Sequence, residues 1–457
     1  MSNNNERLKS RLGFILLSAG CAIGLGNVWK FPYVTGQNGG GIFLILYIIM
    51  LIMFGIPVMV MEFSIGRAAQ KAPVRMYEAL EPQGSRWHIH GIVGMIGCIL
   101  LMMYYSVIAG WILRYFIKYL TGDFDGADPE MVGNIFSSML ASPWINVLYL
   151  GIIVAISFIV CAAGLQNGLE TVTKYMMAVL LISLVVLAIK SFTLKGGMEG
   201  LEFFLMPDTD RIKETGLASV IMSALNQSFF TLSIGIGSMA VFGSYINKER
   251  RLLGEAVNVS LLDTFVAVMA GLIIFPACFS YGIDVSSGPS LLFITMPNVF
   301  SNMALGRLWG GMFFLFMTFA ALSTAFAVYE NVIANFMELT GMSRKKTCLI
   351  CGIGMFVLAL PCALGFNVWS GFKPFGGDST VLDLEDFIVS NILLPGGSVV
   401  YVLFCTLKCG WGWDNFIREA NTGKGLKVPG WLKYYMRYFV PAVLLLVLIV
   451  GLIDFFK

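Results

Sequence analysis

Charge and histidine are scarce in this sequence. Asp, Glu, Lys and Arg together make up 12% of the 457 residues, and only two histidines occur, His88 and His90. A soluble domain needs much more charge on its surface, so that class is excluded. The two histidines lie in one loop, away from any nucleophile–base pair or metal-ligand cluster, and we interpret them as solvated interfacial residues. The chain is therefore not expected to be an enzyme.

Apolar sequence takes the place of charge. Hydrophobic residues reach 57%, the mean hydropathy is +0.80, and a helix needs about 20 apolar residues to cross a bilayer. Eleven runs of that length occupy roughly 11–35, 41–66, 90–118, 144–163, 170–190, 218–245, 256–280, 306–337, 347–366, 385–408 and 434–455. They predict an all-α, polytopic membrane protein whose single transmembrane domain covers residues 1–457.

Basic residues gather in alternate loops. They occur around 7–11, 67–86, 248–251, 344–346 and 418–433, whereas the loops between them are acidic or mixed. Because basic loops stay on the cytoplasmic side, we expect the N-terminus inside and, with an odd number of spans, the C-terminus outside. The outer loops carry no glycosylation signal, which favours a bacterial inner membrane. We expect membrane lipid around the protein, with no nucleic acid and no obligate protein partner.

The first span carries residues that interrupt a helix. It holds Gly20, Gly24, Gly26, Asn27 and Pro32. Glycine costs about 1 kcal/mol in a helix interior, and proline cannot continue a regular helix across its own turn. Inside a membrane, broken backbone is tolerated only where it is buried in protein or lines a polar cavity. A binding site at mid-membrane depth is therefore predicted here.

The sixth span is interrupted in the same way, by Gln227 and two glycines. Breaks that lie five spans apart are typical of an inverted repeat with the site between its halves. We expect one repeat at about 11–190, a second at about 218–408 and an appended span at about 434–455. Close helix packing would explain Gly235 and Gly237 alone, but not Asn27 and Gln227 beside matching breaks.

Several motifs carry a family resemblance. They are residues 20–33 (GCAIGLGNVWKFPY), 38–43 (NGGGIF), 227–237 (QSFFTLSIGIG) and 427–430 (KVPG) with 435–438 (YMRY). In this order they closely resemble the neurotransmitter:sodium symporters, and the chain is similar to the eleven-span bacterial members with the LeuT fold, in which spans 1 and 6 are discontinuous. The resemblance implies sodium-coupled import of a hydrophobic or aromatic L-amino acid by alternating access. The alternatives are a small zwitterion or ω-amino acid as substrate, a non-transporting amino-acid sensor, or an ion channel.

The resemblance implies two sodium sites. Sodium is a hard cation that takes oxygen ligands, much as calcium does. The first site would use the Ala22 carbonyl, Asn27, Thr231 and Asp263. The second would use the carbonyls of Gly20, Ile23 and Ala320 with the hydroxyls of Ser323 and Thr324. Without the resemblance, hydroxyls that bond back to their own helix are the better interpretation of Ser323 and Thr324.

Asp263 is an ionisable residue inside an apolar span, which is costly and usually functional. Chloride-dependent members of the family carry Asn at this position and Ser one turn later, where this sequence has Ala267. The built-in carboxylate predicts transport that does not need chloride, with Tyr47 and Gln227 as supporting partners. A titratable carboxylate here is also compatible with proton exchange on the return step.

Gly24 indicates the substrate class. Amine-transporting relatives place an aspartate at this position, so glycine favours an α-amino acid that brings its own carboxylate. The carboxylate is expected at the amides of Leu25 and Gly26 and at the Tyr105 hydroxyl, although a packing role for Tyr105 is the alternative. The remaining residues expected around the substrate are Ala22, Leu101, Phe230, Thr231, Ser233, Ile236, Thr324 and Val328.

Two gates are implied by the resemblance. Lys30 and Asp386 match the outer ion pair, in which lysine cannot form the bidentate fork of the usual arginine. Glu338 matches the acid of the inner gate, near Ser244 and Tyr245, and Arg7 is the candidate partner although the tryptophan that usually follows it is absent. In the fifth span, Gly168 is followed by Ala178 where bacterial relatives have proline, which argues against a proline-assisted inward opening.

Overall fold

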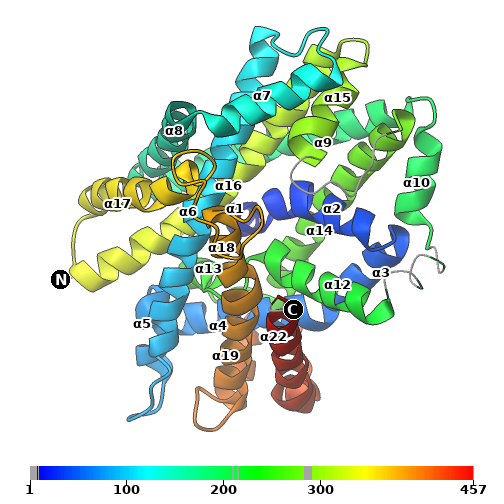
Figure 1. Ribbon diagram of the computed structural model, residues 1–457. Helices are drawn as coiled ribbons and strands as arrows, with labels where there is room; N and C mark the ends of the chain where they lie inside the picture. Colours follow the sequence, from blue (N-terminus) through cyan, green and yellow to red (C-terminus); the bar gives the residue numbers. More distant parts are fainter. Residues whose placement is uncertain are drawn as a thin grey trace.

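The structure is a computed structural model that describes residues 8, 10–207, 210, 213, 216–282 and 291–455 (Figure 1). Helices make up nearly all of this part of the chain. Its only bridge pairings are isolated ones, Gly40 with Pro207 and Arg250 with Lys424. The expected all-α architecture is therefore confirmed.

Each of the eleven predicted spans has its helical counterpart. They are α1 (Arg11–Ala22) with η1 (Gly26–Lys30) and α2 (Phe31–Gln37); α3 (Gly41–Met50), η2 (Leu51–Gly55) and α4 (Ile56–Ala69); α6 (Ile89–Thr121); α8 (Pro143–Ala162); η3 (Leu165–Glu170) and α9 (Thr171–Phe192); α12 (Leu217–Leu232) and α13 (Ser238–Tyr245); α14 (Leu252–Ser280); α16 (Gly306–Thr340); α17 (Arg344–Leu364); α18 (Val381–Phe387), η5 (Ile388–Leu393) and α19 (Leu394–Thr406); and α21 (Leu432–Tyr434), η6 (Tyr435–Phe439) and α22 (Val440–Phe455). Shorter helices connect them: α5 (Pro73–Leu80), α7 (Pro129–Ala141), α10 (Gly197–Leu205), η4 (Leu291–Thr295), α15 (Met296–Ser301) and α20 (Trp413–Ala420).

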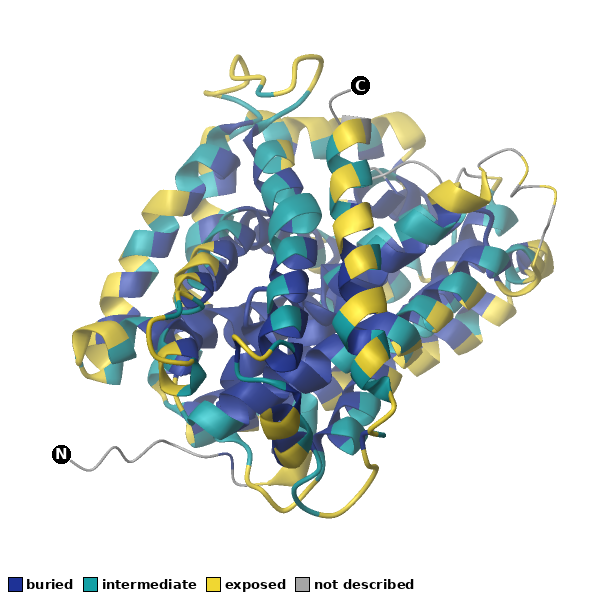
Figure 2. Cartoon of the chain, turned by 90° about the horizontal axis from the view of Figure 1, so that it is seen from below, coloured by how far each residue is buried: buried dark blue, intermediate teal, exposed yellow. Residues whose placement is uncertain are grey.

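Burial separates inner from outer spans. Of the most apolar stretch of α16, 83% is buried, whereas the corresponding figure for the last span is 28%. A helix that is apolar all round belongs in the interior, and α16 packs along α6, α9 and α1. Exposed residues lie along the outward faces of the helices (Figure 2). Exposed apolar side chains include Ile159, Leu349 and Ile353. Such faces suit a lipid environment, so the fold is that of a multi-pass membrane protein.

Spans 1 and 6 are discontinuous, as expected. α1 ends at Ala22, and the two halves of the first span meet at an angle of 52°. In the sixth span, α12 ends at Leu232 and α13 begins at Ser238. Between them Gly235 has φ 103°, and a Cβ there would lie 2.1 Å from the Leu394 carbonyl oxygen. Glycine is therefore required in this break both by backbone angle and by close packing.

One interpretation from the sequence is wrong: His90 is not solvated. It is buried in α6, with its ring centroid 5.5 Å from that of Tyr77 and 5.2 Å from that of Tyr401. His88 stays half-buried and its Nδ1 lies 2.6 Å from Glu81 Oε1. Residues two apart on a helix do not share a face, so one histidine points to the protein core and the other to the surface.

The fifth span begins differently from the others. It starts with η3 directly after Gly164, which has φ 96°, and continues through Ala178 without a break. A Cβ on Gly168 would lie 2.1 Å from the Val160 carbonyl oxygen. Gly168 thus permits close approach of this span to the end of α8.

Candidate functional site

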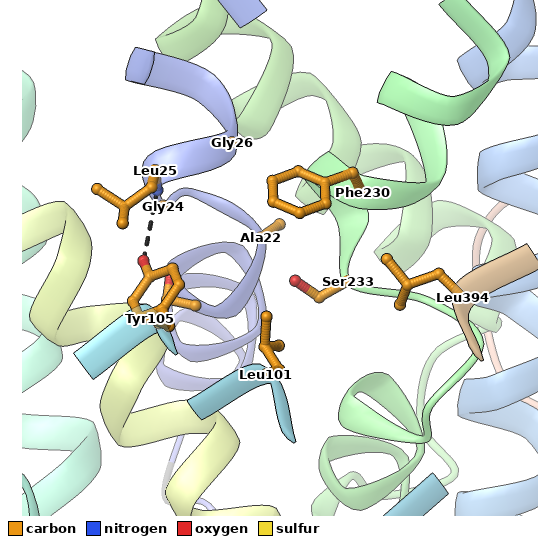
Figure 3. A pocket seen from close by; sticks show the side chains of 10 residues that line it. Ala22, Gly24, Leu25, Gly26, Leu101, Tyr105, Phe230, Ser233 and Leu394 are labelled. Atoms are coloured by element: carbon orange, nitrogen blue, oxygen red, sulfur yellow. Dashed lines mark hydrogen bonds between the residues drawn. The ribbon is translucent and has the colours of Figure 1, made fainter. Parts of the chain in front are cut away.

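The candidate functional site lies where the two broken spans meet in the interior. Figure 3 shows Gly24, Leu25 and Gly26 of the first break on one side of the pocket and Phe230, near the end of α12, with Ser233 of the second break on the other side; Leu101 and Tyr105 of α6 lie beside them. Helix ends leave carbonyl and amide groups without helical partners. Two interruptions side by side therefore concentrate free backbone polar groups at one buried place.

Asp263 is the centre of a buried polar cluster. It is fully buried in α14, and its Oδ1 accepts a hydrogen bond of 2.8 Å from Asn27 Nδ2. The Thr231 hydroxyl donates to both carboxylate oxygens, at 3.2 and 3.1 Å, and the Tyr47 hydroxyl donates at 3.4 Å. Within the described residues Asp263 makes no salt bridge. A buried carboxylate without a cation is costly, so this cluster suits a small hard cation.

The donor set of the first expected sodium site fits such an ion. Carboxylate, hydroxyl and amide oxygens of Asp263, Thr231 and Asn27 are hard ligands. The Asn27 amide carries both a donor and an acceptor, so it can bond the carboxylate directly or share a cation with it. Its Oδ1 now accepts from the Gly24 amide at 3.2 Å. The Ala22 residue lies at the end of α1, where helix carbonyls lack partners.

The expected second sodium site is brought together from the first break and α16. The Thr324 hydroxyl lies 3.1 Å from the Gly20 carbonyl oxygen and 3.2 Å from that of Ile23. The Ser323 hydroxyl instead donates to the Ala320 carbonyl at 2.9 Å. Back-bonding within the helix therefore describes Ser323 but not Thr324, which reaches across to the first span. Together the five residues offer a group of hydroxyl and carbonyl oxygens.

Gln227 ties the two breaks to each other. Its Nε2 donates to the Gly26 carbonyl at 2.9 Å, while its Oε1 is buried and has no hydrogen-bond partner among the described residues. Buried polar atoms are seldom left unpaired. The amide thus fixes the relative position of spans 1 and 6 beside the Asp263 cluster.

A small cavity of about 20 Å³ lies between the breaks. It is lined by Ala22, Gly24, Leu25, Gly26, Leu101, Tyr105, Phe230, Ser233, Thr324 and Leu394 (Figure 3). All of these except Leu394 are expected from the sequence. None carries a charge. The Tyr105 hydroxyl accepts from the Leu25 amide at 3.4 Å, which puts one hydroxyl and one break amide at the same wall.

Three expected substrate residues do not line this cavity. Thr231 turns its hydroxyl to Asp263. Ile236 packs against Gly97, since a Cβ added to Gly97 would lie 2.8 Å from Ile236 Cγ2. Val328 is fully buried in α16.

Gly24 leaves no room for a side chain. A Cβ at this position would lie 2.5 Å from Thr324 Oγ1 and 2.7 Å from the Tyr105 hydroxyl. An aspartate there would displace both groups. The surroundings of Gly24 are thus adapted to a residue without a side chain.

The two residues expected at the outer gate are linked through a serine. Lys30 Nζ donates to Ser390 Oγ at 3.4 Å, and Ser390 Oγ donates to Asp386 Oδ1 at 2.7 Å. The Tyr104 hydroxyl also donates to Asp386, at 3.0 Å, and Lys30 Nζ lies 3.8 Å from the centroid of the Phe230 ring. The structure thus joins Lys30 and Asp386 indirectly. Ser390 lies one turn after Asp386 on the same helical segment and was not predicted from the sequence.

Glu338 and Tyr245, which are expected at the inner gate, border a separate cavity of about 540 Å³. Glu338 accepts from the Ala72 amide at 2.8 Å, and the Tyr245 hydroxyl donates to Glu330 at 2.9 Å. Ser244 also lines this cavity. The expected partner Arg7 lies outside the described residues.

Two charged residues of this region were not expected from the sequence. Glu330 is fully buried in α16 and forms a bidentate pair with Arg344, whose Nε donates to the Cys161 carbonyl at 2.8 Å. A glutamate within an apolar span was the signal that could have revealed this pair.

Glu62 is likewise a glutamate within an apolar span, here the second one. It is fully buried, and its carboxylate accepts from the Gly235 amide and, at 3.3 Å, from the Met239 amide. A carboxylate at the start of a helix stabilises its free amides. Glu62 therefore anchors the second break and the start of α13.

Comparison with known proteins agrees with this geometry. A model of the sodium:neurotransmitter symporter family matches residues 5–130 and 136–457. The sodium-dependent transporter YhdH of Bacillus subtilis is 35% identical over 452 residues, covering 98% of each chain. A sodium-dependent transporter of Haemophilus influenzae is 32% identical and covers 99% of this chain and all of its own length.

A solved structure is also similar. The crystal structure of MhsT in complex with L-phenylalanine superposes with a TM-score of 0.88 at 38% sequence identity, covering 98% of this chain and 99% of that chain. Its LeuT-type fold explains the two broken spans and the buried site between them. The chain belongs to the sodium:neurotransmitter symporter family and is a sodium-dependent transporter of small molecules, not an enzyme.

Proposed function

We propose that this symporter imports a hydrophobic or aromatic L-amino acid by alternating access. The observation that carries the proposal is the uncharged lining of the central cavity, which combines Leu101, Phe230 and Leu394 with the polar wall at Tyr105 and Leu25. A zwitterionic amino acid carries its own positive and negative charges, so its binding site needs only backbone and hydroxyl groups as partners. The complex of MhsT with L-phenylalanine supports an apolar substrate for this chain as well.

Enlargement of the cavity is part of the proposal, since about 20 Å³ holds little more than one water molecule. Phe230 lies at the cavity edge below Lys30. We assign it the role of a lid that rotates away as the substrate enters. Leu101 and Leu394 would then contact the substrate side chain.

Two sodium ions accompany the substrate in this proposal. Ala22, Asn27, Thr231 and Asp263 would hold the first, and Gly20, Ile23, Ala320, Ser323 and Thr324 the second. The carboxylate of Asp263, buried without a salt bridge within the described residues, supports the first assignment. Because Asp263 supplies a fixed negative charge, transport would need no chloride, and the same group could carry a proton outward on the return step.

The gates close the two ends of the path in turn. The outer link runs from Lys30 through Ser390 to Asp386, and we assign Glu338, Tyr245 and Arg7 to the inner gate. The protein would act as one domain in a bacterial inner membrane, in contact with lipid and without an obligate protein partner, with its N-terminus in the cytoplasm and its C-terminus outside. Its two repeats would rock about the site between them.

A competition experiment on the purified full chain tests the substrate class. Binding of labelled L-phenylalanine is measured with sodium, against each of the other amino acids, ω-amino acids, betaines and amines as competitors. We expect hydrophobic and aromatic L-amino acids to compete best. Competition only by amines, betaines or ω-amino acids would overturn the argument from Gly24, and equal binding with potassium would point to a sensor without sodium coupling.

A further inference from the structure

A third hollow lies on the surface of the molecule, between the spans formed by α8 and α17. It measures about 470 Å³ and runs from Gly151 to Ala162 on one helix and from Lys345 to Phe356 on the other. α8 and α17 lie side by side at one edge of the molecule (Figure 1). This groove is separate from both the central cavity and the inner one.

Small residues create the depth of the groove. Gly151 faces the Phe356 ring, and Gly352 faces the Phe158 ring, where a Cβ would lie 3.2 Å away. The rim carries Ile159, which is 70% exposed. A bulkier residue at Gly352 would fill the groove and push on Phe158.

The groove has the length of one lipid leaflet. Gly151 and Ala162 are 11 positions apart, which is about 16 Å of helix at the usual rise. The hydrocarbon core of a bilayer is about 30 Å thick, so one leaflet measures about 15 Å. A single acyl chain can therefore lie along the whole groove.

A positive charge stands at one end of the groove only. Ala162 is the last residue of α8, and Lys345 belongs to the first turn of α17, so both lie at the same end. Lys345 is the one charged residue that lines the groove, is exposed, and makes no salt bridge within the described residues. Its neighbour Arg344 is turned inward to Glu330. At the end of two membrane-spanning helices, an exposed lysine is expected near the lipid headgroups.

We propose that this groove binds one anionic glycerophospholipid, with an acyl chain between α8 and α17 and its phosphate at Lys345. An apolar channel of leaflet length and a basic end complement such a molecule in shape and charge. A zwitterionic lipid would fill the channel but gain less at Lys345.

Native mass spectrometry of the full chain in detergent tests the charge requirement. Phosphatidylglycerol and phosphatidylcholine with identical acyl chains are titrated against the wild-type chain. One phosphatidylglycerol molecule should bind several-fold more tightly than phosphatidylcholine. Lys345→Gln should weaken phosphatidylglycerol binding about fivefold and leave phosphatidylcholine binding unchanged. The matched control is Lys346→Gln, which alters a neighbouring exposed lysine outside the groove. This control should change the binding of neither lipid.

A second pair of variants tests the channel. Gly352→Leu should weaken the binding of both lipids. Gly354→Leu, where a Cβ meets only open space, should weaken the binding of neither. Equal binding of the two lipids to the wild type, equal effects of the two lysine variants, or a dimer that competes with lipid and is lost in Gly352→Leu would each overturn the proposal. If Gly352→Leu does not purify as a folded protein, the lysine pair still decides.

Discussion

Replacing Asp263 with asparagine removes one negative charge from the core and keeps nearly the same shape. The side chain is fully buried, and its hydrogen bonds come from Asn27, Thr231 and Tyr47. If a sodium ion is its charge partner, the loss resembles the breaking of a buried ion pair, which costs about 3–5 kcal/mol. At about 1.4 kcal/mol per tenfold change, sodium affinity should fall at least about 100-fold.

The assay is sodium-dependent binding of labelled L-phenylalanine to purified protein, with the sodium concentration varied at constant ionic strength. The wild type should saturate, and Asp263→Asn should not. Thermal unfolding without sodium supplies the control for folding, because removal of an unpaired buried charge should leave the variant at least as stable as the wild type. An unchanged sodium dependence in a folded variant would refute the assignment of Asp263 as a sodium ligand.

Three further outcomes are expected. Gly24→Ala should weaken amino-acid binding at least about fivefold, because its methyl group would overlap the Thr324 hydroxyl and overpacking costs about 1–3 kcal/mol; equilibrium binding measures this. Ser390→Ala should cut the outer link and speed substrate dissociation, whereas an unchanged rate would show that the link does not gate. Glu330→Gln should lower the melting temperature, since it leaves Arg344 without its buried partner at a cost of about 3–5 kcal/mol; an unaltered melting curve would contradict that cost.

The sequence predicted those parts of the fold that depend on local pattern. Each apolar run predicted to be a span has a helical counterpart. Among the described residues, nine helices, or ten with the bent first pair, are long and apolar enough to cross a membrane. Glycine clusters located both breaks. The residues expected at the two sodium sites could be grouped only through the family resemblance, since Asn27 and Asp263 lie 236 positions apart. No periodicity within a single helix connects them.

What escaped prediction depends on packing between distant spans. Leu394 reaches the central cavity because the tenth span passes close to Gly235, and Ser390 connects Lys30 to Asp386 only in three dimensions. The sequence does not show which way a side chain near a helix end points, so His90 was wrongly assigned to the surface. Its burial between Tyr77 and Tyr401 follows from the rotation of α6.

Uptake into proteoliposomes tests the central claim most directly. Labelled L-phenylalanine is offered to vesicles containing the full chain under an inward sodium gradient, with parallel samples in potassium and in sodium gluconate. The account predicts transient accumulation above the outside concentration with sodium, none with potassium, and no loss when gluconate replaces chloride. Equal uptake with potassium, or uptake that only reaches the outside concentration under a sodium gradient, would contradict sodium-coupled import.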